Sequence, residues 1–337
     1  MIIIDGSAGE GGGQVLRSAL GLSLVTGRPF TIENIRGRRK NPGLLRQHLT
    51  VVKAACEVGL AECKGAELGS RRLAFVPKGV RPGTYHWTIG SAGSCSLVLQ
   101  TVLPALMVAA GPADIVIEGG IHNPMAPPFD FLKETFLPLL ARMGTKVELE
   151  LLRSGFYPTG GGKIRVGVEP AAKPQRLTLI ERGPTHLSAQ ALCVGLPAHI
   201  GLRELDVCRT KLGLTEKETK LVQLERHGPG NVLTVFARSP QLTEIFTGFG
   251  ERGVRAEEVA IRLVEQVREY LQSRALVGHH LADQLLIPLA LSGGGRFLTT
   301  EPSLHTTTNI EVIGRFLDIA IDVSPFHRET WEVRVGR

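Results

Sequence analysis

The hydrophobic and polar positions of the chain repeat at long range. A strand-like apolar segment at residues 2–4 leads into Gly6-Ser-Ala-Gly9 and then into a helical pattern. A second strand-like segment, at residues 85–89, leads into Gly90-Ser-Ala-Gly93 and another helical pattern. The two four-residue segments begin 84 residues apart. Self-similarity at a fixed spacing indicates repeated structural units.

The intervals after these segments follow the same order of elements. The helical pattern after Pro42-Gly43 matches the one that starts near Pro127-Pro128, again at a spacing of 84 residues. One strand-like segment precedes each of these helices and two follow it; they cover residues 30–35, 61–64 and 72–76, then 114–118, 146–151 and 163–168. Each unit therefore predicts the order β-α-β-α-β-β, in which two helices cover one face of a four-stranded sheet.

A third unit opens with a strand-like segment at residues 176–180 and is then interrupted. It resumes with two helical patterns and three strand-like segments, at residues 280–291, 296–300, 309–316, 320–324 and 330–335. The interruption contains a strand at 231–237 and an amphipathic helix at 256–272. The sequence thus predicts an α/β (α+β) fold. Residues 1–180 and 273–337 form a large domain of three repeats, and residues 181–272 form a smaller α/β domain inserted in the third unit.

Composition fits a globular protein, with 43% hydrophobic and 21% charged residues. The longest apolar stretch, at 97–110, is broken by polar residues and Pro104, and it predicts a buried helix rather than a membrane span. The first residues lack the basic start and cleavage site of a signal peptide, so we expect a cytoplasmic protein. Five scattered cysteines without a CxxC pair favour free thiols. An edge strand that pairs with its copy would give a homodimer, although nothing in the sequence selects one.

The charge balance favours a polyanionic partner. Lysine and arginine number 39 against 32 aspartate and glutamate, a net charge of +7. Five cations lie within eleven positions, at Arg36, Arg38, Arg39, Lys40 and Arg46. Such a cluster suits nucleic-acid phosphates, and a solvated loop is the alternative interpretation.

Residues 5–14, DGSAGEGGGQ, place a glycine run at the start of a helix. Backbone N–H groups at such a helix start suit phosphate oxygens. Glu10 supplies a carboxylate, which Mg²⁺ prefers together with substrate phosphates. A tight strand-to-helix turn that needs positive φ is the alternative. Four glycines in five positions exceed that need, so we favour phosphate binding.

The common nucleotide motifs are missing, which directs attention to His305. Gly162-Lys163 is followed by Ile164 and lacks the first glycine of a P-loop, and no Lys-x-Asp-Gly of the lysine-adenylating ligases occurs. A nucleotidyl intermediate would therefore need another nucleophile. His305 lies in residues 302–309, PSLHTTTN, which predict a polar loop before a helix. A neutral imidazole with a pKa near 6.5 can attack an α-phosphate, although a lone loop histidine is more often a surface residue.

Seven ordered segments together resemble the RNA 3′-terminal phosphate cyclases nearly end to end. The similarity is thinnest across residues 185–255. The segments are residues 5–18 (DGSAGEGGGQVLRS), 40–49 (KNPGLLRQHL), 89–104 (IGSAGSCSLVLQTVLP), 123–128 (NPMAPP), 155–162 (GFYPTGGG), 281–285 (LADQL) and 302–309 (PSLHTTTN).

The resemblance implies three β-α-β-α-β-β units, like the C-terminal domain of translation initiation factor 3, with an inserted α/β domain. It implies a three-step reaction on RNA with a 3′-phosphate: a histidine takes AMP from ATP, AMP moves to the RNA 3′-phosphate, and the 2′-OH closes a 2′,3′-cyclic phosphate. His305 matches the nucleophile, and Glu10 matches the contact for Mg²⁺ or Mn²⁺. The phosphate-facing positions match Arg17, Arg36, Arg39 and Gln47. The other ATP positions match Gln100, Pro127, His280, Leu281, Ala282, Asp283 and Gln284.

Two positions depart from the family pattern. His280 stands where relatives often have a tyrosine against the adenine, and Ser154 stands where a basic residue is usual. The first places adenine stacking in doubt and the second one phosphate contact. Neither changes the nucleophile.

Two other functions compete with this one. A non-catalytic cyclase-like scaffold for RNA processing would have lost the histidine, whereas this chain keeps His305, Glu10 and Arg17. An ATP-independent phosphoesterase with two H-x-[ST] motifs would use His86 and His305. That short pattern arises by chance among ten histidines, and it leaves the glycine run unexplained.

Overall fold

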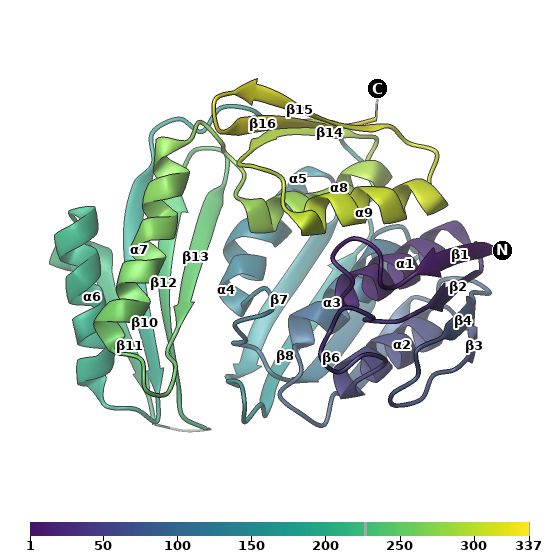
Figure 1. Ribbon diagram of the computed structural model, residues 1–337, viewed down its shortest axis with the longest axis horizontal. Coiled ribbons are helices and arrows are strands. Elements are labelled where there is room, and N and C mark those ends of the chain that lie inside the picture. The colour runs from purple at the N-terminus through teal and green to yellow at the C-terminus, as the bar shows by residue number, and fades with distance from the viewer. Residues whose placement is uncertain (226–227, 337) are drawn as a thin grey trace.

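The computed structural model describes residues 1–225 and 228–336. Within these residues the strands form four four-stranded mixed sheets, each accompanied by helices (Figure 1). The α/β class predicted from the sequence is confirmed. None of the helices in this part of the chain has the length and apolarity needed to cross a membrane.

The N-terminal sheet has the strand order β1-β2-β4-β3. β1 and β2 are parallel, and the remaining neighbours are antiparallel. A helix must cross between parallel neighbours, and α1 does so here. The elements are β1 (Ile2–Asp5), α1 (Gly13–Thr26), β2 (Phe30–Glu33), α2 (Arg46–Val58), β3 (Glu62–Lys64) and β4 (Leu73–Val76).

Two further sheets have the same arrangement, with orders β5-β6-β8-β7 and β9-β14-β16-β15. In each, the first pair of strands is parallel and the others are antiparallel. The second comprises β5 (Gly83–Thr88), α3 (Cys95–Met107), β6 (Ala113–Gly119), α4 (Phe129–Phe131), the π-helical η1 (Leu132–Phe136), α5 (Leu137–Arg142), β7 (Lys146–Arg153) and β8 (Gly162–Glu169). The third comprises β9 (Leu177–Leu179), α8 (His279–Leu291), β14 (Gly295–Thr299), α9 (Leu304–Phe316), β15 (Ile321–His327) and β16 (Thr330–Val335).

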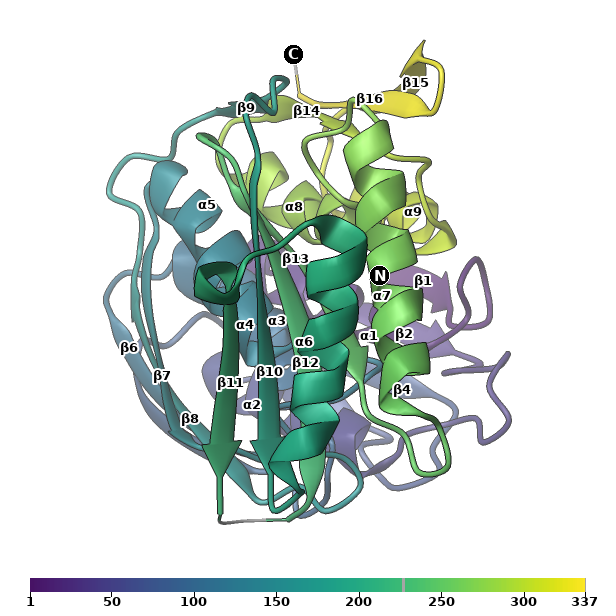
Figure 2. The ribbon, with the colours of Figure 1, turned by 90° about the vertical axis from the view of Figure 1, so that its left-hand side faces the viewer.

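The fourth sheet, β11-β10-β12-β13, comes from the chain between β9 and α8. Helices α6 and α7 lie side by side on one face of it (Figure 2). They bury a separate hydrophobic core that includes Leu205, Leu233 and Leu263. The elements are β10 (His186–Val194), α6 (Ala198–Leu212), the 3-10 turn η2 (Glu216–Glu218), β11 (Thr219–Leu224), β12 (Gly230–Arg238), β13 (Thr243–Phe249) and α7 (Ala256–Gln272).

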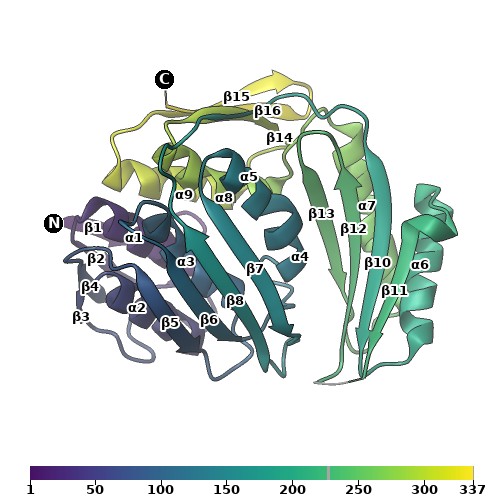
Figure 3. The same ribbon diagram turned by 180° about the vertical axis from the view of Figure 1, so that it is seen from behind.

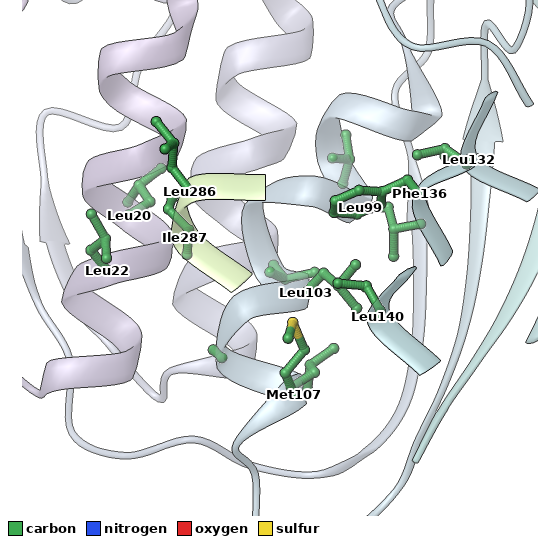
Figure 4. Packing of buried hydrophobic residues seen from close by; sticks show 14 of the residues in the cluster. Leu20, Leu22, Leu99, Leu103, Met107, Leu132, Phe136, Leu140, Leu286 and Ile287 are labelled. Atoms are coloured by element: carbon green, nitrogen blue, oxygen red, sulfur yellow. The ribbon is translucent and has the colours of Figure 1, made fainter. Parts of the chain in front are cut away.

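One hydrophobic core runs through the other three sheets. Figure 4 shows its centre, where Leu20 of α1, Leu103 of α3 and Leu286 of α8 come close together. α1 is buried on nearly all sides because it packs against both α3 and α9. The N-terminal ends of α1 and α9 are thereby held next to each other.

Phe156 connects the fourth sheet to the rest of the molecule. It lies in the connection between β7 and β8, near the end of the second sheet seen from behind in Figure 3. Its ring packs with Leu192, Val194 and Val232 in a small separate cluster. Gly230 gives it room, since a Cβ there would meet the Phe156 ring. Phe156 thus packs the β7–β8 connection against the fourth sheet, while Phe236 and Ile245 of that sheet join the main core.

Candidate active site

The glycine-rich turn joins β1 to α1 and contacts the start of α9. Gly9 has a φ of +56°, and a Cβ there would meet the hydroxyl of Thr308 on α9. A Cβ on Gly12 would lie 2.3 Å from the Glu10 carboxylate. These glycines therefore serve the close approach of neighbouring groups as well as the turn itself.

Glu10 is the carboxylate at the centre of this turn. Its buried side chain pairs with Arg39 and accepts a hydrogen bond from the Gly12 N–H at 2.7 Å. Its own N–H donates to Thr308 Oγ1 at 2.9 Å. These contacts fix the turn both to Arg39 and to α9.

His305 stands in the first turn of α9. The prediction of a polar loop there, with the helix beginning near residue 309, was wrong, because α9 begins at Leu304. Ser303 caps the helix by accepting the Thr306 N–H at 3.3 Å. A serine N-cap of this kind starts a helix even where threonines follow. The imidazole is therefore held on a helix end and not on a free loop.

A hydrogen-bond network ties α1, α8 and α9 together around His305. The Nδ1 atom of His305 lies 2.8 Å from Gln14 Oε1. The Gln14 amide donates from Nε2 to Asp283 Oδ2, also at 2.8 Å. Beside it, Ser18 donates to Asn309 Oδ1 and Asn309 donates to the Asp283 carbonyl, at 2.7 and 2.8 Å.

Burial shifts the ionisation of the groups in this network. It raises the pKa of Asp283 to about 7, against the opposing effect of Arg17. It lowers the pKa of Arg17 to about 10, so this guanidinium stays charged at neutral pH. The pKa of His305 is lowered by loss of water around part of the ring and by the charges of Arg17 and Arg39. His305 is therefore neutral at pH 7, the form that a nucleophile requires.

A small pocket, partly open to solvent, lies between α1, α3 and α8. Its polar lining includes Arg17, Gln100, Asp283 and Gln284, and Gln100 donates a hydrogen bond to Gln284. Apolar side chains, among them Leu103 and Phe136 and others from α3 and α8, line the remainder. A few convergent polar groups in an apolar cleft are typical of a site for a small organic ligand.

The remaining candidate positions contact other parts of the chain. Arg36 donates to the carbonyls of Asn41 and Gly43, and Gln47 accepts from the Ser94 N–H. The Pro127 carbonyl accepts from Ser96 Oγ. The His280 ring lies beside His279, with centroids 3.9 Å apart, and burial together with the neighbouring His279 and His305 lowers its pKa to about 4. Leu281 and Ala282 are fully buried in the core.

Metal ligands are sparse around Glu10. Among residues 1–225 and 228–336, no group of three or more His, Cys, Asp or Glu side chains is placed to hold a metal ion. Glu10 is thus a single carboxylate, and it suits Mg²⁺ only if substrate phosphates and water fill the other positions. It would also have to exchange its partner Arg39 for the cation.

His86, the other histidine of the phosphoesterase alternative, lies on β5. Its exposed ring places Nε2 3.0 Å from Glu118 on the neighbouring strand β6. In the part of the chain that the structure describes, no hydrogen bond or ion pair joins it to the His305 network.

Sequence analysis did not assign roles to Gln14, Thr308 and Asn309. Each touches the candidate site residues directly. Gln14 and Asn309 had a signal, since one follows the glycine run and the other lies one helical turn after His305. A search for polar residues at helical spacing from the candidate nucleophile would have identified Asn309.

Comparison with known proteins gives consistent matches. Residues 8–323 match the family described as RNA 3′-terminal phosphate cyclase. A protein of that name from Koribacter versatilis (strain Ellin345) is 51% identical over 326 residues, 96% of this chain and 92% of the relative. Proteins of the same name from Ectopseudomonas mendocina (strain ymp) and Salmonella agona (strain SL483) are 50% and 49% identical, over 95% and 100% of this chain and 94% and 98% of the relatives.

Proposed function

The chain belongs to the RNA 3′-terminal phosphate cyclase family, and we propose that it converts an RNA 3′-terminal phosphate into a 2′,3′-cyclic phosphate in an ATP-dependent, ligase-class reaction. The observation that carries this function is the family match over nearly the whole chain. A neutral histidine beside two arginines and a glycine-rich helix start is consistent with it.

In the first step, Nε2 of His305 attacks the α-phosphorus of ATP, and the bond to pyrophosphate breaks. The Nε2 atom is free for this attack because Nδ1 is the atom that faces Gln14. Arg17 and Arg39 lie close enough to His305 to influence its ionisation, so they are placed to neutralise the phosphates that react and leave. Arg36 and Gln47 shape the adjoining loops through their backbone contacts.

In the second step, an oxygen of the RNA 3′-phosphate attacks the adenylate phosphorus, and the bond to His305 Nε2 breaks. In the third step, the neighbouring 2′-OH attacks the 3′-phosphorus and loses its proton to water, the bond from that phosphorus to the adenylate breaks, and AMP leaves. This last step is intramolecular, and well-oriented neighbouring groups reach effective molarities of about 10⁵ M or more. Positioning of the RNA end is therefore sufficient for ring closure without a dedicated base.

We place the nucleoside of ATP at the pocket between α3 and α8, on the polar groups that line it. Gln100 and Gln284 present amide groups that can bind the edge of a purine, and Asp283 lies further along the same lining. The Pro127 carbonyl is already bound by Ser96, so it contributes through its ring or its main chain. The buried Leu281 and Ala282 contribute only through their backbone.

Glu10 would hold Mg²⁺ or Mn²⁺ together with the phosphates of ATP. When bound, the cation would neutralise charge on the phosphates in the first step. Release of Arg39 from Glu10 would free that guanidinium for the departing pyrophosphate.

The arrangement of the chain supports the predicted domains. We propose that residues 1–180 and 273–337 form the catalytic domain of three repeats and that 181–272 form an insertion. Three sheets of identical strand order and a fourth with its own core support this division. A cytoplasmic location and a homodimer stay predictions from the sequence.

The decisive experiment is self-labelling with ATP that carries a label on its α-phosphate. We expect an acid-labile, alkali-stable protein adduct in wild type and in His86→Ala, and no adduct in His305→Ala. Normal labelling of His305→Ala would remove that residue from the role. No labelling of wild type would favour the ATP-independent phosphoesterase or the scaffold, whereas loss of labelling in His86→Ala would place His86 in the adenylation site. The isolated adduct should release AMP to RNA with a 3′-phosphate and not to RNA with a 3′-hydroxyl.

A further inference from the structure

His305 is the end of a three-residue chain of hydrogen bonds that begins at the half-buried carboxylate of Asp283. Asp283 on α8 accepts from Gln14 Nε2 at 2.8 Å, and Gln14 Oε1 faces His305 Nδ1 at 2.8 Å. Gln14 is only 8% exposed, so water does not compete freely for its amide.

The orientation of the Gln14 amide follows from the chemistry of its partners. An ionised carboxylate can only accept hydrogen bonds, so the NH₂ group of the amide must face Asp283. The amide oxygen is then left facing His305. An amide oxygen can only accept, so the imidazole must carry its proton on Nδ1 and leave the Nε2 lone pair free.

We infer that Gln14 and Asp283 are positioning residues that hold His305 in the tautomer with a bare Nε2. Free neutral histidine in water prefers the other tautomer, in which the proton sits on Nε2 and blocks attack from that atom. Ring orientation in histidine catalysis is commonly set by the hydrogen bond of the second nitrogen. This inference rests on the proposed role of His305 as nucleophile.

The relay of hydrogen bonds from Asp283 through Gln14 to His305 also acts in the second step, when AMP passes from the histidine to the RNA. Attack through Nε2 forms the N–P bond and leaves the Nδ1 proton in place, so the ring becomes a phosphorylated imidazolium. Gln14 Oε1 accepts a hydrogen bond from that positive N–H, and Asp283 polarises the amide from the other side. When the N–P bond breaks, its electron pair returns to Nε2 and the ring is neutral again. No proton has to enter or leave in either step.

Two nearby hydrogen bonds hold Gln14, Asp283 and His305 in place relative to one another. Glu10 N–H to Thr308 Oγ1 and Ser18 Oγ to Asn309 Oδ1 both join the start of α1 to the start of α9. Asn309 also holds the backbone of Asp283 on α8. The three helices that carry the relay are therefore linked on both sides of Gln14.

The test is ¹⁵N NMR of the histidine ring nitrogens in the full-length protein, with His305 assigned by its loss in His305→Ala. We expect the Nδ1–H tautomer in wild type, where Gln14 Oε1 accepts from the ring. In Gln14→Met, of similar shape but without an acceptor, we expect the Nε2–H tautomer to appear. The self-adenylation rate at saturating ATP should fall about 10²-fold or more in Gln14→Met, with less change in the KM for ATP.

Ser23→Ala is the matched control, since it removes the buried hydrogen bond to the Arg28 carbonyl at the far end of α1. It should leave the tautomer and the rate unchanged. An Nε2–H tautomer in wild type, or the wild-type tautomer in Gln14→Met, would overturn the relay even if His305 carries AMP. Normal labelling of His305→Ala would overturn the proposed nucleophile instead, so the two failures are distinguishable.

Discussion

At the scale of single residues, burial and a neighbouring charge have opposite effects on the pKa of Asp283. Burial raises its pKa to about 7, while Arg17 and the Gln14 amide favour the ionised form. When Asp283 is protonated it can donate a hydrogen bond, so the Gln14 amide is free to turn over and present its NH₂ to His305. Protonation of Asp283 would thus remove the constraint that keeps Nε2 bare.

The rate of self-adenylation should therefore fall as the pH drops through about 7. In Asp283→Asn the self-adenylation rate should fall at a lower pH than in wild type. Of the three hydrogen-bonded residues, only His305 still titrates in this variant, and its pKa lies below its ordinary value. The charged or titratable groups facing the pair are Arg17 on α1, Arg39 with its partner Glu10, and His279 and His280 on α8. Single-turnover labelling from about pH 5 to about pH 9 measures this fall in the rate of self-adenylation. Superimposable profiles of wild type and variant would rule this account out.

At the scale of elements, the turn before α1 depends on what surrounds each glycine. Gly9 and Gly27 both have positive φ, at +56° and +67°. A Cβ on Gly9 would lie 2.2 Å from Thr308 Oγ1, whereas nothing lies within 4 Å of one on Gly27. A side chain would thus strain the backbone at both positions, but only at Gly9 would it also clash with a neighbouring residue.

Gly27→Ala should lower the free energy of unfolding by about 1–2 kcal/mol and leave self-adenylation intact. Gly9→Ala should cost more stability and also slow self-adenylation, because it pushes the turn away from α9. Chemical denaturation and single-turnover labelling would measure the two effects separately. Equal labelling rates in the two variants would show that the contact with Thr308 does not matter to the site.

Elements with a clear period were predictable, and those set by context were not. The amphipathic pattern predicted α7 with its observed bounds, Ala256–Gln272, and the 84-residue spacing placed strand-like segments near the strands of the first two sheets. β10 was missed because residues 191–194 are buried on both faces and show no alternation. The candidate site residues divide in the same way, into those that the local sequence predicts and those that depend on distant residues. Glu10 and Arg17 stood out by charge, while Gln14 gains its meaning only from Asp283, 269 positions away.

At the scale of the whole molecule, Glu244 links the fourth sheet to the catalytic helices. It lies on β13, is 2% exposed, and accepts the N–H of Gly278, the N-cap of α8, at 2.8 Å. Burial raises its pKa to about 7, against the hydrogen bonds from Gly278 and Ile245 that favour the ionised form. The connection between the two cores is therefore sensitive to pH.

The sign of that sensitivity follows from proton binding. Between its ordinary pKa of 4.5 and about 7, Glu244 is protonated in the folded protein and ionised in the unfolded chain. Its contribution to the free energy of unfolding therefore falls as the pH rises through this interval. Glutamine can still accept the Gly278 N–H and does not titrate. Glu244→Gln should gain stability relative to wild type between pH 5 and pH 8, by about 2 kcal/mol.

Denaturant unfolding of wild type and variant at the two pH values measures this difference. The buried groups with shifted pKa values elsewhere, such as Glu204 and His48, titrate equally in both proteins and cancel. Glu257→Gln is the control, because the pKa of exposed Glu257 is lowered to about 2 by Arg203, so it is ionised in both states above pH 5. Its effect should be the same at both pH values. A constant difference for Glu244→Gln would mean that Glu244 is ionised in the folded protein throughout, and that α8 starts from a charged carboxylate.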